Sequence, residues 1–327
     1  MKGLRDAYLV CFGRNSLLER ELKTISLHVK NRGLSVIPLK GPSLARFLYK
    51  DIALRQGGED IDLLVRYDDA LSLCNALAGM GYVFKPDELR LPYRRQVTLV
   101  RRPDQERAGM YLDLHWDFRD RFMKTHVDQF LHHAKEVNIG DYRILMPSSS
   151  DLLLYLALTA ITDFDFVQVK YLYDMHTLIA THGTDIDWEA VTVSARRVGL
   201  STVLYFSLYC AADLFATEIP RHVLQGLKPP FIKRNVLKAW IQRDVILRKR
   251  EAVAVSITWR TFISSYLLSA TLFDCAKIIL KKIFVPLDEV TRSYGEMPYW
   301  RACCMYAKRL MKPLAKAWKL NQEESRG

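Results

Sequence analysis

The spacing of hydrophobic residues changes several times along the first 150 residues. In residues 4–31, leucine and isoleucine recur at three- and four-residue steps, as on one face of a helix. The short apolar run at residues 34–39 includes β-branched side chains and predicts a strand. Pro42 suits the first turn of a second helix. Further along, the same reasoning predicts a helix at residues 69–80 and strands at residues 60–65, 82–84, 96–100 and 110–116.

From residue 151 onward the hydrophobic spacing is helical almost throughout. The change follows residues 147–150, whose proline and serines are typical of a break between elements. We therefore expect an α+β protein with two domains. A small domain with a mixed sheet would occupy residues 1–150, and a helical, basic C-terminal domain would occupy residues 151–327.

The composition excludes several classes of protein. Half of the 327 residues are hydrophobic and 26% are charged, which is typical of a globular chain. A membrane span needs roughly 18 uninterrupted apolar residues, and charged residues interrupt the longest candidate, residues 256–284. The apolar run at residues 7–12 is too short for a signal peptide. The six cysteines follow no zinc or disulfide spacing. We expect a cytoplasmic protein.

The net charge of +12 is concentrated in the C-terminal third. Residues 1–227 contain 28 Lys or Arg and 28 Asp or Glu, whereas residues 228–320 contain 19 against 6. The densest cluster is Arg248, Lys249 and Arg250. Such a region can attract phosphates, nucleic acid or an anionic membrane surface. It can equally be a set of solvated helix faces, because the charges alternate with apolar residues at helical spacing.

Two acidic residues interrupt the strand predicted at residues 60–65. Because alternate residues of a strand share a face, Asp60 and Asp62 project side by side with Leu64, and the apolar residues between them face the core. Their Cα atoms are about 6.6 Å apart at the usual rise per residue. Two carboxylates at this separation repel each other unless a divalent cation lies between them.

The strand predicted at residues 110–116 carries a similar pattern. Leucine and aromatic side chains from Leu112 to Phe118 form one face, and Asp113, His115 and Asp117 form the other. An Asp-x-Asp strand beside a strand with a third aspartate can hold Mg²⁺ by carboxylate oxygens, and two such ions can clamp both oxygens of a phosphoryl displacement. The alternative is an exposed strand whose outer face is acidic. His115 could orient Asp113 or be a structural histidine.

Basic residues near these strands are candidates for phosphate binding. Lys40 and Gly41 lie between a predicted strand and a helix start, where backbone N–H groups and the helix dipole favour an anion. Lys40 could instead be a solvated loop residue. Arg55 lies in a Gly-rich loop five residues before Asp60. It could contact the β- or γ-phosphate of a nucleotide, or it could pair with Glu59 or Asp60.

Several of these residues belong to a larger pattern. It comprises Leu39–Gly41, Tyr49, Arg55, Asp60–Val65 and Leu112–Trp116, and it continues through Lys170–Asp174, Ile186–Trp188 and Phe284–Pro286. The pattern resembles the bacterial uncharacterised nucleotidyltransferase family of the DNA polymerase β-like nucleotidyltransferase superfamily. This resemblance covers most of the chain and implies a mixed sheet followed by a helical region.

The resemblance also implies roles for individual residues. Asp60 and Asp62 would be metal ligands and Asp113 the third catalytic carboxylate, with Mg²⁺ in a two-metal site where Mn²⁺ can substitute. Gly41 would be the glycine that approaches a phosphate. Spacing alone would place Lys170 in a surface ion pair with the residue four positions later. The resemblance makes Lys170 a phosphate contact from the second domain.

One position departs from the family pattern. The superfamily usually has Gly-Ser or Gly-Gly where this chain has Gly41 followed by Pro42. Pro42 has no N–H group to donate to a phosphate. The hydroxyl of Ser43, one position later, could supply the missing contact.

The pattern favours an enzyme that moves a nucleoside monophosphate group from a nucleoside triphosphate (NTP) to a hydroxyl or phosphate of an acceptor. The acceptor could be a small molecule, a saccharide, a peptide or RNA. The alternative is a catalytically silent protein of the same fold that binds RNA or another polyanion through residues 228–320. The three intact carboxylates favour the enzyme.

Overall fold

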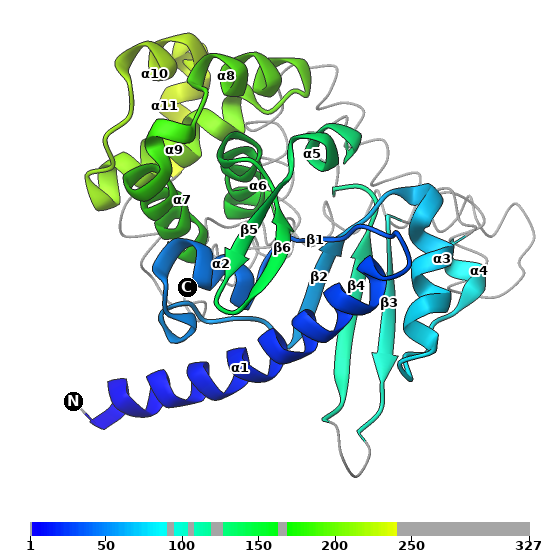
Figure 1. The fold of residues 1–327 in the computed structure, drawn as a ribbon. Helices are drawn as coiled ribbons and strands as arrows, with labels where there is room; N and C mark the ends of the chain where they lie inside the picture. The colour runs from blue at the N-terminus through cyan, green and yellow to red at the C-terminus, as the bar shows by residue number, and fades with distance from the viewer. Residues whose placement is uncertain (1, 90–94, 104–107, 119–126, 163–168, 241–327) are drawn as a thin grey trace, which may run out of the picture.

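The computed structural model describes residues 2–89, 95–103, 108–118, 127–162 and 169–240. Figure 1 shows a small sheet flanked by helices on one side of the molecule and a layer of helices on the other. The fold is therefore of the mixed α+β class, as the sequence predicts. No helix in these ranges has the length and apolar character needed to span a membrane.

The main sheet has four strands in the order β1-β2-β4-β3. Strands β2 and β4 run parallel, and the other two pairs are antiparallel, so the sheet is mixed. The strands are β1 (Ile37–Pro38), β2 (Asp60–Leu64), β3 (Gln96–Arg101) and β4 (Met110–His115). A separate hairpin is formed by β5 (Lys135–Ile139) and β6 (Tyr142–Met146).

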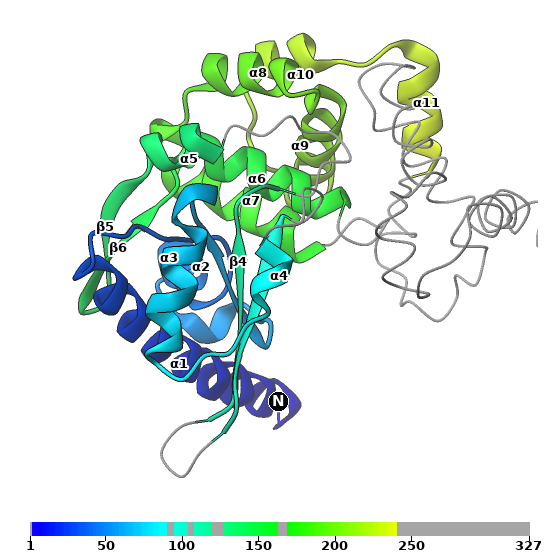
Figure 2. The same ribbon diagram turned by 90° about the vertical axis from the view of Figure 1, so that its right-hand side faces the viewer.

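Helices cover both faces of the main sheet. The N-terminal part contributes α1 (Lys2–Lys30), α2 (Pro42–Tyr49), the short 3₁₀ helix η1 (Ile52–Leu54), α3 (Tyr67–Ala78) and α4 (Pro86–Leu89). The later helices are α5 (Val127–His133), α6 (Ser149–Thr162), α7 (Val169–His182), η2 (Gly183–Asp185), α8 (Trp188–Arg197), α9 (Ser201–Phe215), α10 (Arg221–Leu227) and α11 (Phe231–Trp240). In Figure 2, α11 lies at the edge of this helical layer.

The two faces of β2 enter two different hydrophobic clusters. Ile61, Leu63 and Val65 pack with α1 and α3 in the first cluster. Leu64, on the opposite face, is fully buried in a second cluster with residues of α6, α7 and α9. Asp60 and Asp62 share the face of Leu64 because side chains alternate along a strand. The carboxylates are therefore directed toward the helical layer rather than toward α1.

Several predicted elements differ in detail from the observed ones. The strand expected at residues 34–39 shrinks to β1, an edge strand in which Pro38 has no N–H for the ladder. Residues 82–84 form only a single bridge, between Val83 and Val100. Phe118 was expected on the apolar face with Leu112, but it lies beyond the end of β4 and packs in the helical cluster.

The proposed boundary after residue 150 stays a prediction. The chain does change from strands to helices at Ser149, where α6 begins. However, Leu44 and Leu48 of α2 are buried in the same cluster as α6, α7 and α9. The N-terminal 150 residues thus supply part of the core of the helical layer.

Candidate active site

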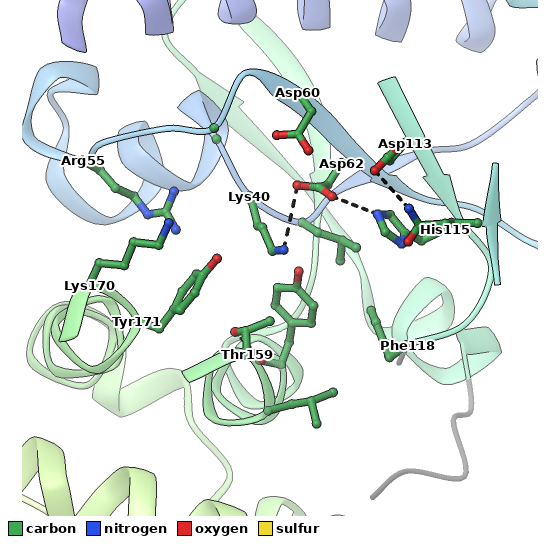
Figure 3. Close-up of a pocket in the computed structure, with 16 residues that line it drawn as sticks. Lys40, Arg55, Asp60, Asp62, Asp113, His115, Phe118, Thr159, Lys170 and Tyr171 are labelled. Atoms are coloured by element: carbon green, nitrogen blue, oxygen red, sulfur yellow. Dashed lines mark hydrogen bonds and ion pairs between the residues drawn. The ribbon is translucent and has the colours of Figure 1, made fainter. Parts of the chain in front are cut away.

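A pocket of about 290 Å³ lies between the sheet and the helical layer. Its walls come from β2, β3 and β4, from the residues just before α2, from the loop before β2, and from α6 and α7. Figure 3 shows carboxylates on the sheet side and basic and aromatic side chains from the helices opposite them. The pocket therefore combines residues from both parts of the chain.

Asp62 and Asp113 lie side by side because β2 and β4 are parallel neighbours and the two residues are partners in register. Asp62 is buried, with 8% of its surface exposed. Strand β3 holds the Asp113 carboxylate: Thr98 Oγ1 donates to Oδ1 at 2.5 Å and Gln96 Nε2 donates to Oδ2 at 3.1 Å. The sequence predicts an aspartate on a neighbouring strand, and β4 is that strand.

His115 contacts Asp62 and not Asp113, the partner that the sequence analysis considered beside a structural role. Its Nε2 atom lies 2.9 Å from Asp62 Oδ1, across the β2–β4 pair. Ligand atoms of Asp62, Asp113 and His115 all lie within 4.8 Å of one another. Carboxylate oxygens suit Mg²⁺ or Mn²⁺, and imidazole is a common ligand of transition-metal ions. The donor set therefore fits a divalent cation.

Asp60 lines the same pocket but is not part of this compact group of ligand atoms. Burial and the charge of Asp62 raise the pKa of Asp60 above its usual range. Burial alone would also raise the pKa of Asp62. The hydrogen bond with His115 and the charge of Lys40 outweigh burial, so the pKa of Asp62 is lowered. Burial and the neighbouring carboxylate thus disfavour ionisation of Asp60, whereas His115 and Lys40 favour ionisation of Asp62.

Basic groups line the pocket around these acids. Lys40, Arg55 and Lys170 all contribute to its wall, and Lys40 Nζ lies 4.0 Å from Asp62 Oδ2. Gly41 also lines the pocket and is the N-cap residue of α2 with φ +77°, a conformation that other residues adopt only with strain. Ser43 is fully buried and is not among the lining residues.

The partner of Arg55 is a correction to the sequence analysis. Arg55 pairs with neither Glu59 nor Asp60, the two carboxylates considered there. Its guanidinium binds Asp174 of α7, and Glu59 pairs instead with Arg14. The expected surface ion pair between Lys170 and Asp174 is also wrong, because Asp174 is only 1% exposed and binds Arg55.

Apart from Lys170, sequence reasoning missed the residues that the helical layer contributes to this pocket. Tyr155 and Thr159 of α6 and Tyr171 of α7 line it together with Phe118. Helical spacing identifies these residues only as candidates for a buried face. Nothing in a local pattern indicates that the buried face borders a cavity.

The basic cluster of Arg248, Lys249 and Arg250 lies outside the described residues, as does most of residues 228–320. The expected affinity of this region for nucleic acid stays a prediction.

A family model described as an uncharacterised nucleotidyltransferase matches residues 1–216 of the chain. No curated protein matches it.

Three solved structures are among those similar to the chain. The lincosamide antibiotic adenylyltransferase LnuA, bound to lincomycin, is 17% identical, with 49% of this chain and 95% of that chain covered and a TM-score of 0.34. An antigenic nucleotidyltransferase-like protein from Paracoccidioides brasiliensis is 11% identical, with 65% and 93% covered and a TM-score of 0.42. The antibiotic-resistance factor ANT(2″)-Ia is 13% identical, with 62% and 96% covered and a TM-score of 0.37.

Proposed function

The chain belongs to the uncharacterised nucleotidyltransferase family, and from that premise we propose that it transfers a nucleoside monophosphate group from an NTP to a hydroxyl or phosphate of an acceptor. One observation carries the proposal: Asp62, Asp113 and His115 bring their ligand atoms together in a pocket that Lys40, Arg55 and Lys170 also line. A cluster suited to a cation beside groups suited to phosphates matches the needs of a metal-bound NTP.

The acidic wall would hold the metal. Asp60, Asp62 and Asp113 are the proposed ligands for Mg²⁺, or for Mn²⁺ in its place, with His115 fixing the orientation of the Asp62 carboxylate. A bound divalent cation supplies charge neutralisation and Lewis acidity at the reacting phosphate. Without it, the pocket places carboxylates where the nucleotide brings further negative charge, and binding would be unfavourable.

The basic wall would hold the phosphates that leave. In the reaction, an acceptor oxygen forms a bond to the α-phosphorus while the bond from that phosphorus to the bridging oxygen breaks and pyrophosphate departs. Lys40, Arg55 and Lys170 would stabilise the charge that grows on pyrophosphate. Ser43 does not reach the pocket wall, so the backbone at Gly41 is the proposed contact at the start of α2.

Asp113 would help to activate the acceptor. Its carboxylate is fixed by Thr98 and Gln96 and lies next to Asp62 in register. It can take the proton of an acceptor hydroxyl as the new bond forms. Tyr155 and Thr159 of α6 also line the pocket and would lie beside a small-molecule acceptor.

Substitution of the two register partners tests the proposal. We expect Asp62→Asn to abolish both transfer and Mg²⁺-dependent NTP binding, because Asp62 would hold the metal that carries the nucleotide. Asp113→Asn should abolish transfer and leave much of the NTP binding intact. Asp117→Asn is the matched control, since Asp117 pairs with Arg95 and does not line the pocket. Transfer is measured with labelled NTPs and a cell extract as the acceptor source, and folding by circular dichroism.

If Asp62→Asn kept the turnover and NTP binding of the wild type, the proposed metal site would be refuted. The proposed enzymatic function would be refuted with it. The alternative, a silent protein that binds a polyanion through residues 228–320, needs no nucleotide. Mg²⁺-dependent thermal stabilisation by an NTP separates the two, because only a folded-state ligand raises the melting temperature.

A further inference from the structure

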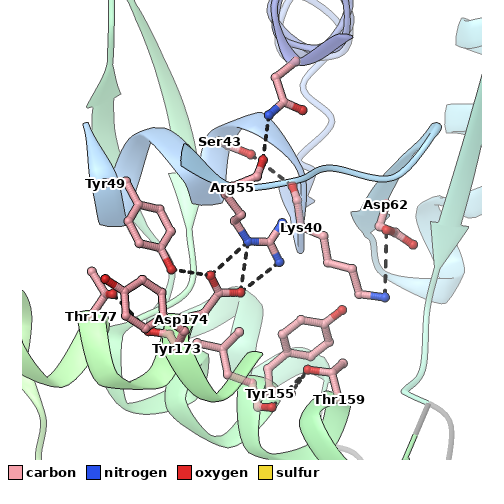
Figure 4. Close-up of polar contacts among 12 residues, drawn as sticks. Lys40, Ser43, Tyr49, Arg55, Asp62, Tyr155, Thr159, Tyr173, Asp174 and Thr177 are labelled. Carbon is pink, nitrogen blue, oxygen red and sulfur yellow. Dashed lines mark hydrogen bonds and ion pairs between the residues drawn. The ribbon is translucent and has the colours of Figure 1, made fainter. Parts of the chain in front are cut away.

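A buried polar network joins Arg55 to the helical layer. Arg55 is 5% exposed and Asp174 is 1% exposed. Arg55 Nε donates to Asp174 Oδ2 at 2.9 Å and to Oδ1 at 3.1 Å, and the hydroxyl of Tyr49 donates to Oδ1 at 2.8 Å. Figure 4 shows the three side chains meeting between α2 and α7. The Asp174 carboxylate therefore holds the Arg55 guanidinium by its Nε edge.

The other edge of the guanidinium makes no hydrogen bond to a described residue. Nη2 lies 2.9 Å from Asp174 Oδ2, an ion-pair distance, but its N–H groups are not aimed at that oxygen and it has no hydrogen-bond partner. Nη1 donates to no described residue either. A buried donor without a partner costs free energy. Because Arg55 lines the pocket, a ligand there can supply the missing acceptors.

The backbone of Arg55 is held as well. Asn15 of α1 is fully buried, and its Nδ2 donates to the carbonyl oxygens of Ile52 at 2.5 Å and Arg55 at 2.9 Å. A Cβ atom at Gly57 would lie 2.4 Å from Asn15 Oδ1, so the loop packs directly on this amide. Arg55 is thus fixed at both its backbone and its Nε edge. Its two Nη groups, called the fork below, are directed at the pocket.

We propose that Asp174 and Tyr49 are positioning residues that orient the Arg55 fork toward the β- and γ-phosphates of the NTP. This inference rests on the proposed function. An arginine fork matches two phosphate oxygens in a fixed geometry, and its value depends on pre-organisation. Burial and the nearby Asp174 charge raise the pKa of Tyr49, so its hydroxyl stays protonated and donates to Asp174. Lys170 of α7 lines the same side of the pocket.

Binding of triphosphates and monophosphates separates a positioning role from a structural one. The β- and γ-phosphates are absent from a nucleoside monophosphate, so we expect Tyr49→Phe and Asp174→Asn to weaken NTP binding and leave monophosphate binding unchanged. The expected loss of NTP affinity is about 10-fold for Asp174→Asn and less for Tyr49→Phe. The probes are ATP, GTP, CTP and UTP, each with Mg²⁺, and the monophosphate of the one that binds most tightly.

The control is Tyr173→Phe, which removes a hydroxyl from the same helix. The Tyr173 ring stacks on Tyr49 at 6.0 Å, but its hydroxyl does not bind Asp174. It should bind every probe like the wild type. In an Arg55→Gln background, Asp174→Asn should cause no further loss of NTP affinity if Asp174 acts through Arg55.

The outcomes are distinguishable. If the wild-type protein binds no NTP, the proposed function fails. If the wild type binds NTP and Tyr49→Phe and Asp174→Asn bind it equally well, or if they weaken monophosphate binding as much, only the positioning role fails. Tyr49→Phe keeps the test decisive if Asp174→Asn does not fold, because it retains the ring and both members of the ion pair.

Discussion

Two buried arginines in this protein have the same kinds of neighbour, a carboxylate and tyrosine rings. They contact the carboxylate through different atoms of the guanidinium. Arg101, the last residue of β3, binds Glu21 of α1, and the Tyr82 hydroxyl donates to the same carboxylate at 2.8 Å. Arg55 binds Asp174. Each arginine also lies over a tyrosine ring, at 5.1 Å for Arg101 over Tyr82 and 5.7 Å for Arg55 over the ring of Tyr171.

The difference lies in which edge of the guanidinium meets the carboxylate. Both Nη atoms of Arg101 donate to Glu21, one to each carboxylate oxygen, and it is Nε that has no partner. Arg55 donates to its carboxylate through Nε, and its Nη2 lies 2.9 Å from Asp174 Oδ2 but makes no hydrogen bond. The bidentate pair is the stronger arrangement in isolation. Under the proposed role, the Nη groups of Arg55 are available to a ligand in the pocket.

The contrast indicates that burial of an ion pair does not by itself reveal its role. Arg101 ties α1 to the edge of the sheet and is not among the residues that line the site pocket. Both of its Nη groups are already bound to Glu21. Arg55 is equally buried, yet its hydrogen bonds are incomplete without a ligand. Each arginine has one buried nitrogen without a hydrogen bond, so the proposed difference in role rests on position: Arg55 lines the pocket and Arg101 does not.

The largest expected effect is on folding, through Glu21→Gln. This substitution removes the negative charge of Glu21 from its buried pair with Arg101, which is 5% exposed. Removing one member of a buried pair costs about 3–5 kcal/mol of unfolding free energy. NTP affinity per folded molecule should not change. Urea denaturation and NTP titration of the same preparation measure both quantities. A variant that is as stable as the wild type but binds NTP weakly would reverse the roles assigned to the two arginines.

A smaller effect is expected when each arginine is replaced by lysine. Lysine is a point charge that can keep one ion pair but has no fork. Arg55→Lys should retain the pair with Asp174 and lose the contact with phosphate, so NTP affinity should fall about 10-fold, or about 1.4 kcal/mol. Arg101→Lys should lower stability and leave NTP affinity unchanged. Equal losses of NTP affinity in the two variants would contradict the contrast.

The acidic wall of the site could be predicted from the sequence because a strand has a period of two residues. That period alone puts Asp60 and Asp62 on one face and Asp113 on a second strand with similar alternation. The register that makes Asp62 and Asp113 partners is not encoded locally. It depends on how β2 and β4 pair. The same pairing brings the His115 ring into contact with Asp62 rather than with Asp113.

The basic wall could be predicted only as a set of candidates. Arg55 and Asp174 are 119 residues apart in the chain, and no periodicity connects a loop to a helix at that separation. Both residues belong to the pattern that resembles the family, but their contact is a property of the packing of α7 on α2. Pro38 shows a local limit as well, because an apolar run predicted a full strand where proline permits only a short edge.

The smallest expected effect extends the contrast to the acidic wall. Burial and the charge of Asp62 raise the pKa of Asp60, so in the metal-free protein the ionised form is disfavoured relative to the unfolded chain. The stability that Asp60 contributes is present below its unfolded pKa and is lost as the pH rises through the folded pKa. Asp117, by contrast, is partnered by Arg95 at 3.1 Å.

We therefore expect Asp60→Asn to stabilise the metal-free protein at pH 7 by less than about 1 kcal/mol, because Asp60 is partly exposed to water. The gain should disappear in acid, where the wild-type carboxyl is protonated, while Asp117→Asn should give no gain at either pH. Urea denaturation in the presence of a chelator measures the difference. With Mg²⁺ and NTP added, the sign should reverse, since the wild type gains ligand stabilisation that the variant lacks. A ligand-binding group of this kind destabilises the ligand-free protein and stabilises the bound one. If Asp60→Asn were less stable than the wild type under both conditions, Asp60 would have a role in folding alone.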